Sequence, residues 1–236
     1  MRAIVLAGGK GSRLAPYTKN IPKPLVPIGD MPILEILLRQ LKLAGIKDVT
    51  LTVGHLAEIL RSFLQDGSRL GMNISYSYEE NPLGTSGPLS LIKGLDESFL
   101  VTNGDVLTDL RIDELIKFHK QQGAMATIAM HQRQVNIDLG VIQCDGNQKV
   151  IGYVEKPTID YLVSMGIYVF EPGILAYIPH NQYLDFPDLV HLLLDAGEKV
   201  VGYLFNGYWQ DLGHPDDYEY ATNDFESMRS QFLPES

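Results

Sequence analysis

The sequence of 236 residues is poor in cysteine and contains no long hydrophobic run. Its single cysteine, Cys144, excludes an internal disulfide framework and indicates a reducing compartment. The apolar run near the N-terminus, residues 3–6, is too short for a secretory signal, and no later stretch approaches the length of a membrane span. We therefore expect a cytoplasmic protein with no membrane partner.

Basic residues are also scarce, because 19 Lys and Arg face 29 Asp and Glu. This acidic balance argues against nucleic acid as a partner. The histidines show no metal-ligand spacing, and there is no G-x-S-x-G nucleophile motif. The basic residues that precede Asp30, the first acid, are Arg2, Lys10, Arg13, Lys19 and Lys23. The sequence thus predicts a local electropositive region near the N-terminus, suited to a small anion such as a mononucleotide.

A glycine-rich turn follows directly on the first apolar run. Residues 3–6 are typical of a buried strand, and Gly8, Gly9 and Gly11 break it at once. Successive backbone N–H groups in such a turn form an anion-binding concavity. The turn is neither a Walker loop nor a dinucleotide-binding fingerprint, since Leu14 stands where the third glycine belongs. A turn needed only for packing is the alternative interpretation.

The hydrophobic periodicity predicts an α/β fold. Predicted helices cover residues 32–44, 56–64, 86–95, 112–121, 187–196 and 215–225. Predicted strands cover residues 49–53, 74–78, 99–102, 126–130, 139–144, 150–155, 162–170 and 200–204. Strand and helix alternate in the first half, which favours parallel βαβ units, whereas short turns join the strands of the second half. The sequence predicts a doubly wound, mostly parallel mixed sheet with a small antiparallel portion.

Two acids follow predicted strands that lie far apart in the sequence. Asp105 ends the run Asn103-Gly104-Asp105, and Asp211 lies in Trp209-Gln210-Asp211-Leu212-Gly213. Because ligands of such folds bind at the carboxyl ends of the strands, the two carboxylates could share one Mg²⁺ against nucleotide phosphates. For Asp105 alone, a turn or capping role is the simpler interpretation.

Taken together, these motifs resemble the L-A-G-G-x-G-[ST]-R-L, P-K-P-L, G-D and W-x-D-[IL]-G motifs of the sugar-phosphate nucleotidylyltransferases, the NDP-sugar pyrophosphorylases. The resemblance runs from Arg2 to about Phe225, with Ser12 in place of the more usual Thr. It is closest to the short mannose and heptose 1-phosphate guanylyltransferases that lack a C-terminal β-helix. It implies a Rossmann-like, GT-A-like fold and the formation of an NDP-sugar and pyrophosphate from an NTP and a sugar 1-phosphate, with Mg²⁺ as cofactor.

The resemblance also implies roles for individual residues. Arg13 and Lys23 would be catalytic, and Asp105 and Asp211 would bind the metal. The implied nucleotide-binding residues are Leu6, Ala7, Gly8, Gly9, Lys10, Gly11, Ser12, Glu79, Pro82, Gly84, Thr85, Asn103 and Gly104. The implied sugar-phosphate-binding residues are Gly140, Glu155, Lys156, Gly166 and Tyr168. We expect a single domain, 1–236, with a nucleotide-binding half (1–110), a sugar-phosphate-binding half (111–225) and a tail (226–236); a homo-oligomer stays open.

Fewer residues bear on the identity of the nucleotide base and on the choice between alternative functions. A carboxylate at Glu79 or Glu80 favours GTP, because guanine presents neighbouring N–H donors to an acceptor, whereas two exposed loop acids would give the same pattern. Ser164 and Met165 depart from the family pattern and leave the sugar open, with mannose 1-phosphate or a related sugar favoured. The alternatives are a uridylyl- or thymidylyltransferase acting on glucose 1-phosphate, a GT-A-type glycosyltransferase, and a non-catalytic nucleotide-sensing paralogue. Asp105-Val106-Leu107 lacks the second acid that a glycosyltransferase would carry.

Overall fold

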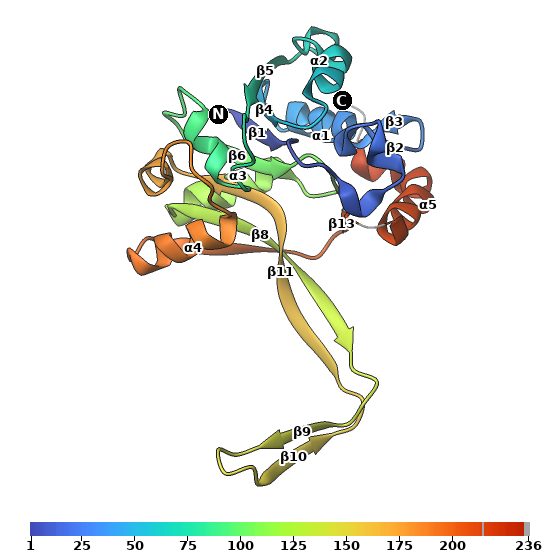
Figure 1. Cartoon of the computed structure of the whole chain (residues 1–236), viewed down its shortest axis with the longest axis vertical. Coiled ribbons are helices and arrows are strands. Elements are labelled where there is room, and N and C mark those ends of the chain that lie inside the picture. The colour runs from blue at the N-terminus through green and yellow to red at the C-terminus, as the bar shows by residue number, and fades with distance from the viewer. Residues whose placement is uncertain (214, 234–236) are drawn as a thin grey trace.

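A seven-stranded sheet forms the centre of the computed structural model, which describes residues 1–213 and 215–233 (Figure 1). The strand order is β12-β8-β11-β6-β1-β4-β5. In the described residues β11 alone runs against its neighbours, so the predicted mostly parallel, mixed sheet is confirmed. The strands are β1 (Ala3–Leu6), β4 (Asp48–Val53), β5 (Asn73–Tyr78), β6 (Phe99–Asn103), β8 (Ala126–Asn136), β11 (Thr158–Phe170) and β12 (Val200–Phe205).

Helices cover both faces of this sheet. Alternate residues of β1 point to opposite sides, since Ala3 and Val5 join one buried cluster and Ile4 joins another. The first cluster lies under α1 (Ile33–Leu43), α2 (Ala57–Leu64) and α3 (Ile112–Gln122), and the second lies under α4 (Phe186–Asp195). None of these helices, nor any other in the described residues, is long and apolar enough to cross a membrane.

The helix predicted over residues 86–95 is wrong. Only a short 3-10 helix, η5 (Gly87–Leu91), forms there. The N–H groups of Ser86 and Gly87 donate to the Leu184 carbonyl, at 2.9 and 3.0 Å, and so attach this segment to the chain before α4. Glycine at residue 87 and again at residue 94 also makes a helix of this length unfavourable.

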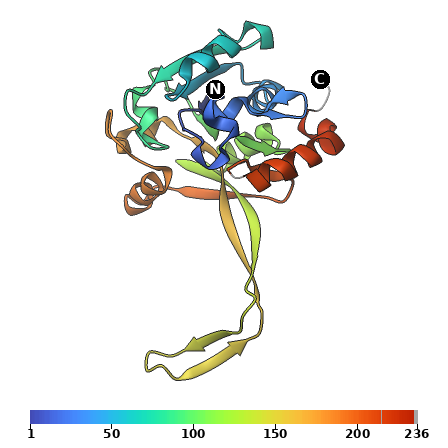
Figure 2. The ribbon, with the colours of Figure 1, turned by 45° about the vertical axis from the view of Figure 1, so that its right-hand side comes forward.

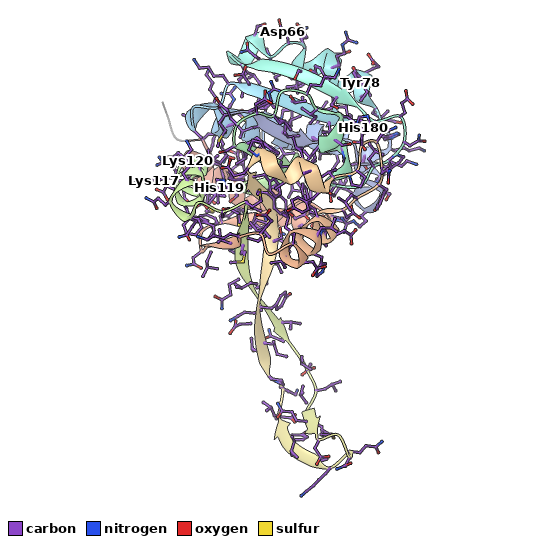
Figure 3. All side chains as sticks on the ribbon, turned by 90° about the vertical axis from the view of Figure 1, so that its left-hand side faces the viewer. Asp66, Tyr78, Lys117, His119, Lys120 and His180 are labelled. Atoms are coloured by element: carbon purple, nitrogen blue, oxygen red, sulfur yellow. The ribbon has the colours of Figure 1, made fainter. Side chains whose placement is uncertain are left out.

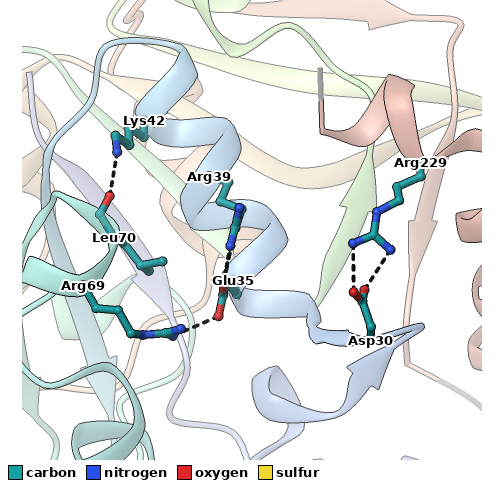
Figure 4. A network of polar contacts seen from close by, with 7 residues as sticks. All are labelled: Asp30, Glu35, Arg39, Lys42, Arg69, Leu70 and Arg229. Carbon is teal, nitrogen blue, oxygen red and sulfur yellow. Dashed lines mark hydrogen bonds and ion pairs between the residues drawn. The ribbon is translucent and has the colours of Figure 1, made fainter. Parts of the chain in front are cut away.

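The final helix is longer than the sequence pattern indicated. Its predicted end near Phe225 is wrong, because α5 (Pro215–Phe232) continues for two more turns into the segment expected to be a tail. Phe225 and Phe232 lie seven residues apart on one helix face, and both are fully buried with their rings stacked at 5.8 Å. Arg229 adds an ion pair to Asp30 at 2.8 Å (Figure 4). Packing of this second ring thus fixes the end of the helix.

A buried carboxylate joins α1 to the short 3-10 helix η4 (Ser68–Leu70), which lies between α2 and β5. Glu35 accepts hydrogen bonds from Arg39 at 2.7 Å and from Arg69 at 2.9 Å (Figure 4). Burial acts to raise the pKa of Glu35, but the two guanidinium groups hold it below its usual value. Lys42 donates to the Leu70 carbonyl at 2.8 Å, close to the same contact. These bonds position α1 and the strands that it covers.

His119 has a comparable structural role on α3. Its two ring nitrogens lie 2.8 Å from Thr127 Oγ1 and 3.0 Å from Glu171 Oε1. Its neighbours Lys117 and Lys120 are exposed on the outer surface of the same helix (Figure 3). The histidine therefore anchors α3 to the sheet.

A long β-ribbon leaves the sheet where β8 and β11 continue beyond it (Figures 1 and 2). Its far end carries the hairpin β9 (Val141–Cys144) and β10 (Val150–Val154), which confirms that a short turn joins the predicted strands 139–144 and 150–155. We call residues 134–162 the arm. The predicted strands 126–130 and 162–170 are too short, because each continues into the arm by pairing with the other.

We predict that replacing Phe232 by alanine lowers the free energy of unfolding by about 3–5 kcal/mol, because a fully buried ring is lost. Urea denaturation followed by the fluorescence of Trp209 measures the change. Tyr220→Ala is the matched control, since that side chain on the same helix is 67% exposed and should cost less than about 0.5 kcal/mol. An unchanged stability of Phe232→Ala would show that the end of α5 does not pack on the body.

Candidate active site

The glycine-rich turn lies at the carboxyl end of β1, where the strand order reverses. β4 pairs with one side of β1 and β6 with the other, and the next strands continue outward from each. Such a reversal opens a crevice at the strand ends. Gly11 has a φ of +62°, and its carbonyl accepts from the Thr18 hydroxyl at 2.7 Å. The turn is therefore held in a conformation that requires glycine.

This crevice is a cavity of about 800 Å³, a size typical of small-molecule sites. The predicted nucleotide-binding residues line it, with one exception. Gly104 lies beneath the surface, and its N–H donates to the Leu6 carbonyl at 2.9 Å. The lining residues are Leu6, Ala7, Gly8, Gly9, Lys10, Gly11, Ser12, Arg13, Lys23, Pro24, Thr52, Gly54, His55, Glu79, Glu80, Pro82, Gly84, Thr85, Asn103, Asp105, Tyr183 and Gly213.

At one end of the pocket a fixed carboxylate faces the glycine turn. A Cβ built on Gly8 would lie 2.7 Å from Glu79 Oε1, so this oxygen lies directly against the turn. The other oxygen, Oε2, accepts from the Leu83 N–H at 3.1 Å. Burial raises the pKa of Glu79, and the bond from Leu83 opposes that shift. This end of the pocket offers hydrogen-bond acceptors in a defined position.

The wall beside Glu79 is attached to the start of α4. Thr85 donates from its hydroxyl to Asp185 Oδ1 at 3.1 Å and accepts from the Phe186 N–H at 2.8 Å. Gly84 has a φ of +76°, and a Cβ there would lie 2.6 Å from the Leu184 carbonyl. The Thr85 hydroxyl is therefore engaged by the fold, and its hydrogen bonds hold the wall in place.

At the other end of the pocket one lysine joins two aspartates. The Lys23 ammonium pairs with Asp105 and lies 3.8 Å from Asp211 Oδ1. The short strands β7 (Val106–Thr108) and β13 (Trp209–Asp211) pair, and the Leu212 N–H donates to the Asp105 carbonyl at 3.2 Å. The structure thus brings together two acids that lie far apart in the sequence.

Electrostatics couple the groups at this end. Burial and the nearby charge of Asp105 raise the pKa of Asp211, while Lys23 and Arg13 act to lower it. Arg13 lies in η1 (Ser12–Leu14) and reaches the same place, because a Cβ on Gly213 would lie 3.6 Å from its guanidinium nitrogen and 3.4 Å from Asp211 Oδ1. Arginine, lysine and two carboxylates therefore converge beside the glycine turn.

The two carboxylates fit a divalent cation that takes its remaining ligands from phosphate and water. Within residues 1–213 and 215–233 no group of three or more His, Cys, Asp or Glu could hold a metal alone. Mg²⁺ typically uses one or two protein carboxylates together with substrate phosphates, so two suffice. Lys23 already places a positive charge between them.

The predicted sugar-phosphate-binding residues divide into two groups. Gly166, with a φ of +72°, borders the pocket, since a Cβ there would lie 2.5 Å from Asn103 Nδ2. Tyr168 does not line the pocket; its ring is buried against Phe186, and its hydroxyl lies 2.9 Å from Ser164 Oγ.

Gly140, Glu155 and Lys156 lie on the arm and are not part of the pocket wall. On the arm the Tyr153 hydroxyl donates to Glu155 at 2.7 Å. Lys156 pairs with Asp138 at 2.7 Å. The structure therefore does not bring these three residues to the pocket of their own chain.

Sequence reasoning missed part of the pocket wall. Thr52 lies at the carboxyl end of β4, the neighbour of β1, and Gly54 and His55 follow that strand. The rule that ligands bind at strand ends could have found them. Tyr183 lies about 100 residues after the wall that it completes, and no local pattern indicates it.

Comparison with known proteins shows which family the chain resembles in sequence. The model of the Nucleotidyl transferase family matches residues 2–228. The chain is 37% identical over 238 residues to the UTP–glucose-1-phosphate uridylyltransferase of Synechocystis sp., covering 92% of this chain and 61% of that protein. It is 35% identical over 226 residues to the mannose-1-phosphate guanylyltransferase catalytic subunit beta of Danio rerio, covering 92% and 62%. The chain thus spans less than two thirds of the length of these two curated relatives.

A crystal structure from Bacillus anthracis, assigned to a glucose-1-phosphate thymidylyltransferase, covers 98% of each chain with a TM-score of 0.78 and 26% identity. This similarity confirms the predicted Rossmann-like nucleotidyltransferase fold. By the family match over nearly its whole length, the chain belongs to the nucleotidyl transferase family.

Proposed function

We propose that the chain joins an NTP to a sugar 1-phosphate and releases pyrophosphate, with GTP and mannose 1-phosphate or a related sugar as its substrates. The observation that carries this proposal is the polarity of the pocket. Glu79 follows β5 on one side of β1, and Asp105 follows β6 on the other side, where Lys23 pairs with it and lies near Asp211. The relatives support the reaction type, because those named above act on mannose 1-phosphate or glucose 1-phosphate.

The reaction asks the protein mainly to position two anions. An oxygen of the sugar phosphate attacks the α-phosphorus of the nucleotide, and the bond to the pyrophosphate oxygen breaks. Arg13 and Lys23 would offset the charge that develops on the leaving pyrophosphate. Mg²⁺, held by Asp105 and Asp211, would supply further charge neutralisation at the phosphates. The turn's backbone N–H groups would hold the phosphate chain.

Glu79 supports guanine as the base. Guanine presents an N1–H and an exocyclic NH₂ side by side, and a carboxylate offers only acceptors. Uracil and thymine present one N–H between two carbonyl groups, so they also need a donor. Glu79 is fixed by Leu83 with its second oxygen against the glycine turn. UTP is the second candidate, because the Synechocystis relative is a UTP–glucose-1-phosphate uridylyltransferase.

The same proposal assigns the two substrates to different parts of the chain. Residues 1–110 would bind the nucleotide, and residues 111–225 would bind the sugar phosphate. Gly166, beside Asn103, would leave room for the sugar next to the nucleotide. Lys156 would pair with the sugar phosphate, and Glu155 would accept hydrogen bonds from sugar hydroxyls.

We predict that Asp105→Asn lowers the rate of pyrophosphate release on the order of 10²- to 10³-fold and raises the Mg²⁺ concentration needed, because one metal ligand loses its charge. A coupled pyrophosphate assay across a Mg²⁺ titration measures both effects. Asp48→Asn, an exposed substitution at the far end of β4, is the control and should leave both unchanged. A near-normal rate and Mg²⁺ requirement for Asp105→Asn would remove Asp105 from the metal site.

We predict that the wild-type protein prefers GTP in a matrix of NTPs against sugar 1-phosphates, and that Glu79→Gln lowers kcat/KM for GTP about 10- to 100-fold. The loss corresponds to one hydrogen bond to a charged acceptor. Glu58→Gln is the matched control, since its exposed side chain on α2 has the same chemistry and does not line the pocket. Equal use of GTP and UTP by the wild-type protein would reject the guanine assignment, whereas pyrophosphate from no pair of substrates would reject the proposed function.

A further inference from the structure

The arm exposes large apolar side chains at a higher density than the rest of the described residues. None of the residues 134–162 is buried, and the arm stands clear of the body in two views (Figures 2 and 3). It carries ten of the 21 large hydrophobic side chains that are exposed in the described residues. These ten are Val135, Leu139, Ile142, Val150, Ile151, Tyr153, Val154, Ile159, Tyr161 and Leu162.

Strand pairing arranges several of these side chains on common faces. Ile159 pairs with Val135 along the stem of the arm, and Tyr153 pairs with Ile142 in the hairpin, so the members of each pair point the same way. If each of the ten residues exposes about half of a surface of roughly 150–200 Å², the arm presents on the order of 800 Å² of apolar residues. That matches the area that each partner buries in a stable interface, about 800 Å².

The arm also carries residues that the proposed reaction needs. Glu155 and Lys156 lie on it, while the pocket is lined by residues of the body. In the described residues the hydrogen bonds and ion pairs that involve side chains of residues 134–162 stay within the arm. Lys156 thus pairs with Asp138 of the arm, and in the described residues it forms no ion pair with the body of its own chain.

The stem of the arm makes return to its own pocket unfavourable. Seven consecutive pairs join β8 to β11, from Thr158 and Asn136 to Ser164 and Met130. At about 3.4 Å per residue this paired stem spans about 20 Å. Bending it back would break ladder hydrogen bonds, whereas docking on another molecule leaves the ladder intact.

A second copy of the chain is the partner that supplies what the arm lacks. Each copy has one arm and one pocket, so a two-fold exchange uses both arms and both pockets and closes the assembly.

We propose that the arm docks on a second copy of this chain and that its Glu155 and Lys156 complete the sugar-phosphate end of that copy's pocket. The assignment of these two residues to the sugar phosphate rests on the proposed function. The docking itself rests on the exposed apolar area and on the paired stem.

Complementation between two inactive variants tests the exchange. Asp105→Asn damages the pocket and Lys156→Ala damages the arm, so each variant alone should lose at least 100-fold in activity. The two are co-expressed with different affinity tags, and the mixed dimer is isolated by tandem purification. One of its two sites then combines an intact pocket with an intact arm, and we expect about half of the wild-type activity.

Three results of this experiment would overturn the proposal. A mixed dimer as inactive as its parents would show that arm and pocket act within one chain. Failure to recover a doubly tagged species would show that the copies do not associate. A fully active Lys156→Ala variant would show that the arm lysine does not serve the site. Circular dichroism of each variant confirms that it is folded.

Sedimentation measures the docking without any activity, so it separates this proposal from the proposed function. The wild-type protein should sediment as a dimer, and Tyr161→Glu should shift it to monomer. Tyr220→Glu is the matched control on α5, where an exposed tyrosine lies outside the arm, and it should remain dimeric. A monomeric wild-type protein would overturn the docking even if the enzyme were active, and a dimer without activity would overturn the proposed function alone.

Discussion

The contact of one lysine with two aspartates is the interaction on which the pocket depends. Lys23, Asp105 and Asp211 come from three separate parts of the chain. Burial and the charge of Asp105 raise the pKa of Asp211, so the two carboxylates would repel each other without a cation between them. The pairing of β7 with β13 brings the acids together, and the positive charge of Lys23 offsets the repulsion between them. Fold and site are therefore coupled at this point.

The same sheet gives the pocket its second end. β4 and β5 extend the sheet on one side of β1, and the chain after β5 carries Glu79 over the glycine turn. The following wall is fixed to α4 through Thr85 and Asp185. One end thus offers hydrogen-bond acceptors and the other carries charged groups. Because Glu79 and Asp105 each follow a strand of the same sheet, the strand order sets the separation between the two ends.

Much of this arrangement follows from local patterns, and the remainder depends on long-range packing. The glycine turn and Asp105 could be predicted because each directly follows a buried strand, and strand ends meet at one edge. The extent of α5 could not, because it depends on Phe232 packing against Tyr208 and Phe225. Tyr183 was missed for the same reason. The arm's strands were predicted in part, but periodicity does not reveal whether a strand is covered, and Glu155 and Lys156 were expected in the pocket.

The formal charges around the pocket explain why it would need a further cation from outside its own body. The N-terminal segment predicted a strongly positive site, yet only Lys10, Arg13 and Lys23 of its basic residues line the cavity. Four carboxylates accompany them, from Glu79, Glu80, Asp105 and Asp211. A pocket without excess positive charge cannot by itself hold two polyanions side by side. A divalent cation would offset the acids near the nucleotide phosphates, and the second anion then requires a further cation, which Lys156 on an arm that reaches another molecule would provide.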